Sequence, residues 1–384
     1  MRTRAAVLYG PHTEYKVEEI ELDDPKANEV LVRFVASGMC HSDEHMVTGD
    51  MAMDPAIIEM LGWQQYPIIL GHEGAGVVLE VGPEVRGVSP GDRVVLNWVI
   101  PCGACRACHR GSAVHCQSSR PAHVMEPSAA HAHAAGTLLR GLPVDRSFNL
   151  GTLCGLALVR QAAVTRLETN VSFESACIVG CGVMTGFGSA VNVARVAPGS
   201  SVAVIGCGGV GLNVIQGARH AGASRIIALD LQPGPLERAR RFGATEVIQV
   251  DASDRELDAA AAEVRRRCGG AGADYAFEAT SVPRLAFAPL KLIRDGGMAL
   301  QVSGINDPVT VPMPLFMWDK TYVTPLYGGC VPSRDFPRIF NLHAEGRLLL
   351  DELVTRTYRL EQLGEAFDDL LAGRLAKGVI TFGS

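Results

Sequence analysis

The segment Ser201-Val-Ala-Val-Ile-Gly-Cys-Gly-Gly-Val-Gly211 decides the fold of the second half of the chain. It begins with a short β-branched apolar run, which predicts a strand, and its glycines lead into a segment over 212–220 that predicts a helix. The next apolar run, Arg225-Ile-Ile-Ala-Leu-Asp230, ends in an acid nineteen residues after Gly211. A strand, a glycine-rich turn, a helix and an acid at this spacing make up the dinucleotide-binding pattern.

Each glycine of this turn meets a different physical requirement. Gly206 permits the tight turn, Gly208 lets the backbone approach a pyrophosphate, and Gly211 lets the helix pack on the strand. The unpaired N–H groups and positive dipole of the helix N-terminus favour phosphate. The predicted cofactor-binding residues of this turn are Gly206, Gly208, Gly209, Val210 and Gly211. Asp230 is expected to accept hydrogen bonds from the adenosine ribose and to repel a 2′-phosphate, which predicts NAD rather than NADP.

Strands and helices continue to alternate after Asp230. Further apolar runs predict strands over 246–250, 274–278 and 298–303, and helical segments lie between them over 234–242 and 256–266. Strands that alternate with helices in this way form a doubly wound parallel sheet.

The rest of the chain has a different pattern. Residues 4–35 and 76–95 alternate β-rich runs with proline and charged turns, which predicts a β-rich domain. Helices are expected near the C-terminus, over 333–344 and 360–372. The predicted organisation is a catalytic domain over 1–182, a nucleotide-binding domain over 183–326, and a return to the catalytic domain over 327–384.

Four cysteines lie close together in the first half, within a predicted lobe over 97–120. Four thiolates within fifteen residues are enough to saturate a tetrahedral zinc ion, which is typical of a structural site. The predicted ligands of this structural zinc are Cys102, Cys105, Cys108 and Cys116. In an oxidising compartment the same cysteines would instead form disulfides.

A second, dispersed group offers three ligands. Cys40, His72 in Gly-His-Glu-Gly-Ala-Gly, and Cys181 in Gly-Cys-Gly-Val-Met-Thr-Gly supply two sulfurs and one imidazole. Three protein ligands leave the fourth zinc position open, which is typical of a catalytic site. We therefore expect two zinc ions per chain.

Composition limits the function classes. The chain has 384 residues, 47% of them hydrophobic and 20% charged, and a net charge of −6 without a basic block, so no nucleic-acid partner is expected. Its apolar stretches are broken by glycine and polar residues, and its N-terminus lacks a signal-peptide core, so neither a membrane role nor secretion is expected. We expect a cytoplasmic protein with reduced cysteines.

The run Gly71-His-Glu-x-x-Gly76-x5-Gly82-x-x-Val85 is similar to the zinc signature of the medium-chain dehydrogenase/reductase family. The chain resembles zinc-dependent alcohol dehydrogenases of that family over residues 5–382. The resemblance implies an α/β protein with a β-rich GroES-like catalytic domain and a Rossmann domain. The loop after the structural cysteines and Leu326-Tyr-Gly-Gly-Cys330 look closer to the glutathione-dependent formaldehyde dehydrogenase branch and its actinobacterial alcohol dehydrogenase relatives.

The resemblance also implies a mechanism. Zinc acts as a Lewis acid on an alcohol, and hydride passes to the nicotinamide of NAD. Ser42 and His45 match the family's proton relay, although His45 as a plain surface histidine is the alternative. Glu73 matches an acid behind the metal, and Asp43 is the expected partner of the His72 imidazole.

Further site residues follow from the resemblance alone. His41 and Lys377 match positions whose cations face the pyrophosphate. Thr185 and Val210 match positions that pack behind the nicotinamide. Trp98 matches the aromatic wall of the substrate pocket, with an ordinary core residue as the alternative.

Two segments depart from the family pattern. Residues 54–62 predict an added short helix, which either contacts substrate or packs on the surface. Residues 117–150 carry His123, His131 and His133 and are interpreted as a solvated loop rather than a third metal site.

The leading functional interpretation is an NAD-dependent oxidoreductase that interconverts a small-molecule alcohol and an aldehyde or ketone. The alternatives are a formaldehyde dehydrogenase that depends on glutathione or mycothiol, and a catalytically silent protein that binds NAD and zinc. The family implies a homodimer or a tetramer, and the formaldehyde-dehydrogenase-like features favour the dimer.

Overall fold

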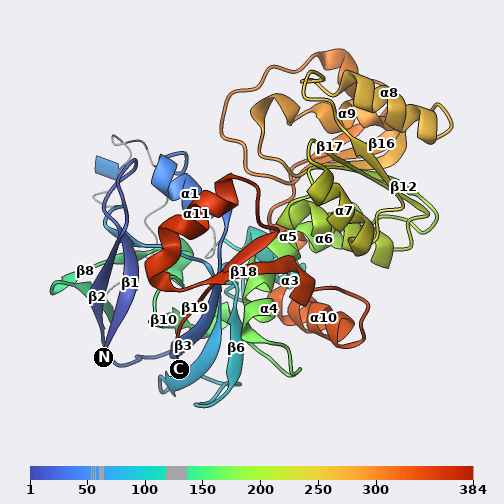
Figure 1. The fold of residues 1–384 in the computed structure, drawn as a ribbon. Helices are drawn as coiled ribbons and strands as arrows, with labels where there is room; N and C mark the ends of the chain where they lie inside the picture. The colour runs from blue at the N-terminus through green and yellow to red at the C-terminus, as the bar shows by residue number, and fades with distance from the viewer. Residues whose placement is uncertain (53, 55, 57, 60–64, 118–135, 384) are drawn as a thin grey trace. The chain divides into compact units, whose positions relative to one another are not determined.

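The structure is a computed structural model that describes residues 1–384 except 53, 55, 57, 60–64, 118–135 and 384. The chain folds into two compact units (Figure 1). One unit is discontinuous and consists of Met1–Cys181 and Val331–Ser384, and the other is Gly182–Cys330. We call them the catalytic unit and the nucleotide unit.

The nucleotide unit is built on one parallel sheet (Figure 1). Every strand pairing in it is parallel. Its strands lie in the order β14 (Glu246–Gln249), β13 (Arg225–Asp230), β12 (Ser201–Ile205), β15 (Ala273–Glu278), β16 (Ile293–Gln301) and β17 (Thr321–Val323). Counted from the first strand of the unit, this is the order 3-2-1-4-5-6 of a Rossmann fold. The predicted doubly wound sheet is confirmed.

Helices connect these strands and bury one face against them. The helices of the unit are α5 (Gly182–Gly188), a π-helical turn η7 (Ser189–Val193), α6 (Gly209–His220), α7 (Pro233–Phe242), α8 (Asp258–Arg267) and α9 (Ala288–Leu292). Ile205, Leu229 and Ala276 of the sheet share a buried cluster with Val264 of α8 and Leu290 of α9. Apolar residues at helical spacing in α8 therefore face the sheet, while its arginines stay at the surface.

The nucleotide unit ends at Cys330, whereas the sequence places the boundary after residue 326. Tyr327–Gly329 form a short 3-10 turn, η10, that packs on α5. The Asn192 side chain donates a hydrogen bond to the Gly328 carbonyl at 3.2 Å. These contacts keep the turn with the nucleotide unit.

The catalytic unit contains two mainly antiparallel sheets. One has the order β8 (Leu142–Pro143), β7 (Thr137–Leu139), β2 (Lys16–Leu22), β1 (Arg2–Leu8), β4 (Ile68–Ile69), β9 (Asp145–Arg146). The other has the order β11 (Val164–Arg166), β6 (Arg93–Leu96), β5 (Glu73–Val81), β3 (Glu29–Gly38), β19 (Lys377–Thr381), β18 (Val354–Tyr358), with β10 (Leu156–Arg160) also on β3. Among the described residues, its helices include α1 (His41–Thr48), α3 (Arg106–His109), α4 (Phe173–Cys177), α10 (Pro332–Ala344) and α11 (Leu363–Leu371).

Strand β19 comes from the end of the chain and pairs with β3 from its beginning. Leu8, Met39, Phe367 and Ile380 belong to one buried cluster that joins these distant segments. The β-rich catalytic domain is therefore completed by the C-terminal residues, as predicted.

The two departures from the family pattern are only partly described. Most of the helix predicted over 54–62 lies outside the described residues, but Asp54 accepts a hydrogen bond from the Ala56 N–H at 2.8 Å, as an N-cap does. His123, His131 and His133 also lie outside the described residues. The solvated-loop prediction is wrong for 136–150, because β7, β8 and β9 form there and Leu139, Val144 and Leu150 are buried.

Within the described residues, no single helix has the length and apolar composition needed to cross a bilayer. Only the bent pair Phe173–Gly180 and Gly182–Val193, taken together, meets that criterion.

Candidate active site and structural metal site

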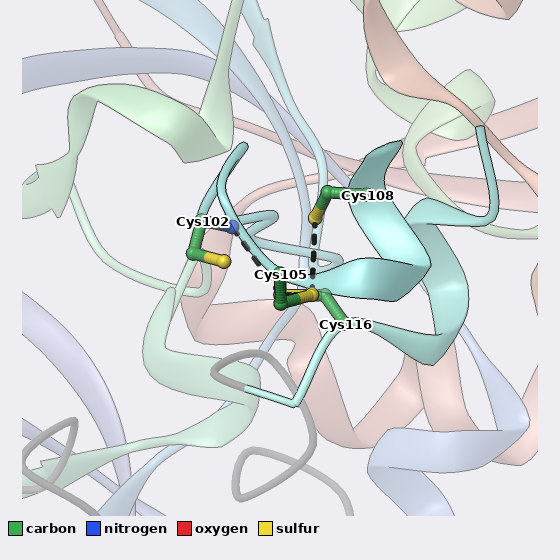
Figure 2. A group of neighbouring side chains, drawn as sticks. All are labelled: Cys102, Cys105, Cys108 and Cys116. Carbon is green, nitrogen blue, oxygen red and sulfur yellow. Dashed lines mark hydrogen bonds between the residues drawn. The ribbon is translucent and has the colours of Figure 1, made fainter. Parts of the chain in front are cut away.

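The four clustered cysteines converge as predicted. One ligand atom from each of Cys102, Cys105, Cys108 and Cys116 lies within 4.8 Å of all the others, and Figure 2 shows the side chains drawn together from α3 and its flanking loops. The Cys105 sulfur is 3.6 Å from that of Cys108 and 3.9 Å from that of Cys116. No disulfide joins any of the eleven cysteines, all of which lie in the described part of the chain.

Backbone donors prepare this cluster for a metal. The Cys102 N–H donates a hydrogen bond to the Cys116 sulfur at 3.3 Å. A hydrogen bond from the Cys108 backbone lowers the pKa of Cys105 to about 6, whereas burial raises the pKa of Cys108 to about 12, so Cys105 is the thiol of this pair that ionises first. Four thiols in this arrangement fit a closed, structural zinc site.

The dispersed ligands also come together, within the catalytic unit. Cys40 is the N-cap of α1, His72 directly precedes β5, and Cys181 follows the short 3-10 turn Ile178–Gly180. Together with Glu73, their ligand atoms all lie within 4.8 Å of one another. Ends of three separate elements therefore position a second metal site, distinct from the four cysteines.

The hydrogen bonds of His72 suit a metal ligand. Its Nδ1 lies 3.1 Å from Asp43 Oδ1, which confirms the predicted partner. Asp43 also accepts the Gly71 N–H at 3.1 Å, and both side chains are fully buried. The other ring nitrogen, Nε2, is buried and has no hydrogen-bond partner of ordinary geometry among the described residues. A carboxylate on one imidazole nitrogen and a metal on the other is a common second shell of zinc sites.

The two thiols of this site interact directly. A hydrogen bond with Cys181 and the nearby charge of His72 lower the pKa of Cys40, although burial opposes that shift. Two sulfurs and one imidazole in a buried setting fit zinc, and they leave one coordination position for a small molecule.

Glu73 and Lys377 form a buried ion pair beside these ligands. Lys377 Nζ is 2.7 Å from the Glu73 carboxylate and donates to the Met39 carbonyl at 2.8 Å. Burial alone would lower the pKa of Lys377, but the Glu73 charge raises it, so the ammonium form is favoured. Its side chain is only 6% exposed. Glu73 and Met39 occupy two of the three donors of the Lys377 ammonium group, and its predicted contact with the pyrophosphate stays a prediction.

The predicted relay residues share one helix. Ser42 and His45 are three residues apart in α1 and therefore lie on the same face. The Ser42 hydroxyl oxygen is 3.7 Å from the Cys40 sulfur. His45 Nδ1 is 2.9 Å from Asp50 Oδ2, a partner that the sequence did not indicate. His41, at the start of the same helix, is exposed.

An aromatic contact near the metal ligands was also missed. The Phe148 ring lies 4.4 Å from the His72 imidazole and 5.7 Å from the Trp98 ring, measured between centroids. Phe148 adopts a left-handed backbone conformation, with φ of 54°, which hydrophobic periodicity does not reveal. Trp98 is buried at 5% exposure. Phe148 contacts both Trp98 and the predicted metal ligand His72, which is consistent with the predicted position of Trp98 near the metal.

In the nucleotide unit, the glycine-rich turn behaves as predicted. Gly206 has φ of +88°, and α6 begins at Gly209 with Gly208 as its N-cap. A Cβ on Gly211 would clash with the Gly206 carbonyl oxygen, whereas a Cβ on Gly208 would meet nothing within 4 Å. Gly211 is therefore required for packing, and the space above Gly208 is open to a ligand.

Asp230 ends β13 and is held against this turn. Its Oδ2 accepts the Cys207 N–H at 2.9 Å, and its Oδ1 accepts the Gln232 N–H at 3.0 Å. Each oxygen keeps further acceptor capacity for a ribose hydroxyl. Thr185 lies on α5, which packs on α6 so closely that a Cβ on Gly186 would clash with the Val210 carbonyl oxygen.

Glu278, at the carboxyl end of β15, is a further residue that sequence reasoning missed. It is fully buried, and burial raises its pKa. Its Oε1 accepts hydrogen bonds from the N–H and hydroxyl of Thr280 at 2.5 Å, and its Oε2 accepts from the Ser303 hydroxyl. It thus ties together two loops at the sheet edge where dinucleotides bind in this fold.

Comparisons with known proteins agree with this geometry. The family model "Alcohol dehydrogenase GroES-like domain" matches residues 26–169, and "Zinc-binding dehydrogenase" matches residues 209–345. The chain is 35% identical to "Putative alcohol dehydrogenase D" of Mycobacterium tuberculosis, over 99% of this chain and 100% of that protein. The chain belongs to the zinc-dependent medium-chain alcohol dehydrogenase family. It is an oxidoreductase that acts on small molecules.

Other relatives of this dehydrogenase extend the comparison. An "NDMA-dependent alcohol dehydrogenase" of Amycolatopsis methanolica is 35% identical over 99% of both chains. Among solved structures, an alcohol dehydrogenase zinc-binding domain protein from Burkholderia ambifaria has a TM-score of 0.88 at 30% identity, covering 100% of each chain. Benzyl alcohol dehydrogenase from Acinetobacter calcoaceticus has a TM-score of 0.86 at 27% identity, also over 100% of each chain.

The two glycines of the turn supply a matched pair of variants. Gly208→Ala should leave the thermal unfolding midpoint of the dehydrogenase near the wild-type value and weaken NADH binding at least tenfold, because its Cβ occupies only ligand space. Gly211→Ala should lower stability by about 1–3 kcal/mol, because overpacking forces the helix away from the turn. Fluorescence titration with NADH and urea unfolding measure the two effects. Equal loss of stability in both variants would contradict the assignment.

The two metal sites can be separated in the same way. Cys105→Ala should lower the zinc content by one and destabilise the dehydrogenase by about 4 kcal/mol or more, because a structural metal contributes to folding. Cys181→Ala should also lose one zinc and abolish turnover, but keep the wild-type circular dichroism spectrum and urea midpoint within about 1 kcal/mol. If both variants unfold to the same extent, the division into structural and catalytic sites is wrong.

Proposed function

We propose that the protein is an NAD-dependent zinc alcohol dehydrogenase that interconverts an alcohol and an aldehyde or ketone by hydride transfer. One observation carries this proposal. Cys40, His72 and Cys181 supply three ligand atoms within 4.8 Å of one another, in a chain whose other unit has a dinucleotide-binding turn. Three protein ligands are typical of catalytic zinc, and a second zinc would be held by Cys102, Cys105, Cys108 and Cys116.

The residues around the first site have separate tasks. Zinc, when bound there, would supply Lewis acidity to an alcohol oxygen. Asp43 fixes the His72 ring through its 3.1 Å hydrogen bond, so that Nε2 is the nitrogen that coordinates. Lys377 balances the negative charge of Glu73, whose carboxylate lies within 4.8 Å of the three ligand atoms. Ser42 and His45 would carry the alcohol proton towards solvent along one face of α1.

The cofactor assignment rests on the nucleotide unit. Open space above Gly208 and the N-terminus of α6 suit the phosphates, and Asp230 at the end of β13 suits a ribose with free hydroxyls. The negative charge of Asp230 disfavours a 2′-phosphate, which supports NAD over NADP. Thr185 and Val210 are proposed to pack behind the nicotinamide, and exposed His41 to face the pyrophosphate.

The substrate would contact aromatic side chains. Phe148 and Trp98 lie next to the ligand His72, which favours an alcohol with apolar surface near its hydroxyl group. A thiol-dependent formaldehyde dehydrogenase and a catalytically silent protein remain the alternatives, and the alcohol dehydrogenase names of the relatives favour neither. A cytoplasmic location is part of the proposal.

A cofactor and substrate screen tests the proposal. Purified protein with measured zinc content should reduce NAD in the presence of primary, secondary or aromatic alcohols, and formaldehyde oxidation should show no dependence on added thiol. Asp230→Asn keeps a hydrogen-bond acceptor but removes the charge, so the preference for NAD over NADP should fall about tenfold or more. If the protein holds NAD too tightly to exchange it, added NAD will not be reduced. Mass spectrometry of the denatured protein detects such bound cofactor. Absence of turnover with every alcohol in zinc-replete, cofactor-loaded protein would contradict the proposal.

We further propose that the protein forms a homodimer through the edge of its parallel sheet. Strand β17 is one of the two edge strands of this sheet, and Met313, Met317 and Trp318, which precede it in the chain, are 71%, 51% and 68% exposed. Exposed apolar groups at an open strand edge favour pairing with a second copy.

Sedimentation equilibrium tests the assembly. The wild type should sediment at about twice 40.8 kDa. Trp318→Glu should shift the population towards the monomer, because a charge is placed in the apolar contact. Leu142→Glu is a matched control, since Leu142 is 70% exposed in the catalytic unit. A tetrameric mass, or an equal effect of both substitutions, would contradict dimerisation through this edge.

A further inference from the structure

The end of α1 folds back on itself and brings a carboxylate to the relay histidine. Gly49 follows the helix with φ of +84°, a left-handed conformation that reverses the chain. The Met51 N–H then donates to the His45 carbonyl at 3.1 Å. As a result, Asp50 lies beside the helix rather than beyond it.

Two donors of the helix converge on one oxygen of Asp50. His45 Nδ1 is 2.9 Å from Asp50 Oδ2, and the Thr48 hydroxyl donates to the same oxygen at 2.8 Å. The negative end of the helix dipole repels a carboxylate at the C-terminus. The two hydrogen bonds offset this repulsion. The hydrogen bonds from His45 and Thr48 lower the pKa of Asp50, which keeps it ionised.

An ionised carboxylate only accepts hydrogen bonds. The proton in the contact between His45 and Asp50 must therefore reside on Nδ1. In the neutral imidazole, Nε2 then carries the lone pair and is the nitrogen able to take up a proton.

We propose that Asp50 is a positioning residue of the proton relay, which fixes the His45 tautomer and strengthens Nε2 as a base. This inference rests on the relay of the proposed function. When Nε2 takes up the relayed proton, an N–H bond forms as the O–H bond of the donating hydroxyl breaks, and the imidazolium later releases a proton to solvent. No electron changes place in this step, and Asp50 stabilises the imidazolium without accepting the proton.

Other charged groups also face His45. The Glu44 carboxylate lies 3.7 Å from Nδ1, outside hydrogen-bonding distance, and burial raises its pKa. His41 lies one turn earlier in the same helix, and His12, whose N–H donates to the Val47 carbonyl at 2.7 Å, lies near Asp50. Among the described residues, Asp50 is the carboxylate that hydrogen-bonds the ring.

Nitrogen-15 spectra of histidine-labelled protein test the tautomer without turnover. The ring signals of His45 are assigned by their absence in His45→Gln. In the wild type above pH 8, the shifts should show a protonated Nδ1 and an unprotonated Nε2. Asp50→Asn should give a mixture of tautomers, while Glu44→Gln, which removes the neighbouring carboxylate, should keep the wild-type shifts.

The pH profile of kcat/KM supplies the second readout. Asp50→Asn should lower kcat/KM at neutral pH about tenfold and move the acid limb to lower pH, because the imidazolium loses its partner. If Asp50 had only a structural role, Asp50→Asn would lower kcat/KM without moving the acid limb of the pH profile. A wild-type spectrum with the proton on Nε2, or Asp50→Asn spectra and acid limb equal to those of the wild type, overturns the proposal. The spectra are recorded without substrate and therefore test the tautomer alone. If the alcohol dehydrogenase assignment were wrong, the wild type would show no turnover, whatever its spectra.

Discussion

The buried charges around Cys40, His72 and Cys181 are the constraint on which the rest of the catalytic unit depends. Glu73 and Lys377 are nearly inaccessible to water, and removing one partner of such a pair typically costs about 3–5 kcal/mol. Their pairing requires β5 and β19 to lie on either side of β3, although β19 is more than 300 positions later in the chain than β5. The metal ligands are therefore positioned by the same interaction that closes the domain. A divalent cation would add positive charge where two thiols and a carboxylate meet, which is why this site fits zinc.

The candidate functional residues of both units lie at the ends of helices and strands. Cys40 caps α1, His72 precedes β5, Gly208 caps α6 and Asp230 ends β13. Rigid strands fix these positions. At the end of an element, the backbone still has unpaired N–H groups that can bind a ligand, or turns sharply so that a side chain can reach one. Gly38 illustrates how closely the interior is fitted, because a Cβ there would clash with the Glu73 carboxylate.

Much of this site was predictable because its signals are local. The conformation of the glycine-rich turn and the convergence of the four cysteines are predicted from spacing over a few residues, and the structure has both. The Asp43 partner of His72, 29 positions away, was expected beside the family motif and is also found. The pairing of Lys377 with Glu73 and the contacts of Phe148 and Asp50 were missed for different physical reasons. Lys377 meets Glu73 only through strand pairing across the chain, Phe148 depends on a left-handed backbone, and Asp50 depends on the reversal at Gly49. None of these leaves a periodic pattern in the sequence.

We propose that two sets of side chains hold two different zinc ions. Zinc analysis combined with X-ray absorption at the zinc edge tests it most directly on purified wild-type protein. We predict two zinc ions per chain, one bound by four sulfurs and the other by two sulfurs, one imidazole nitrogen and one oxygen or nitrogen atom of a small molecule. A single zinc ion with four sulfur ligands in a fully metal-loaded protein would contradict it, because Cys40, His72 and Cys181 would then not be a metal site.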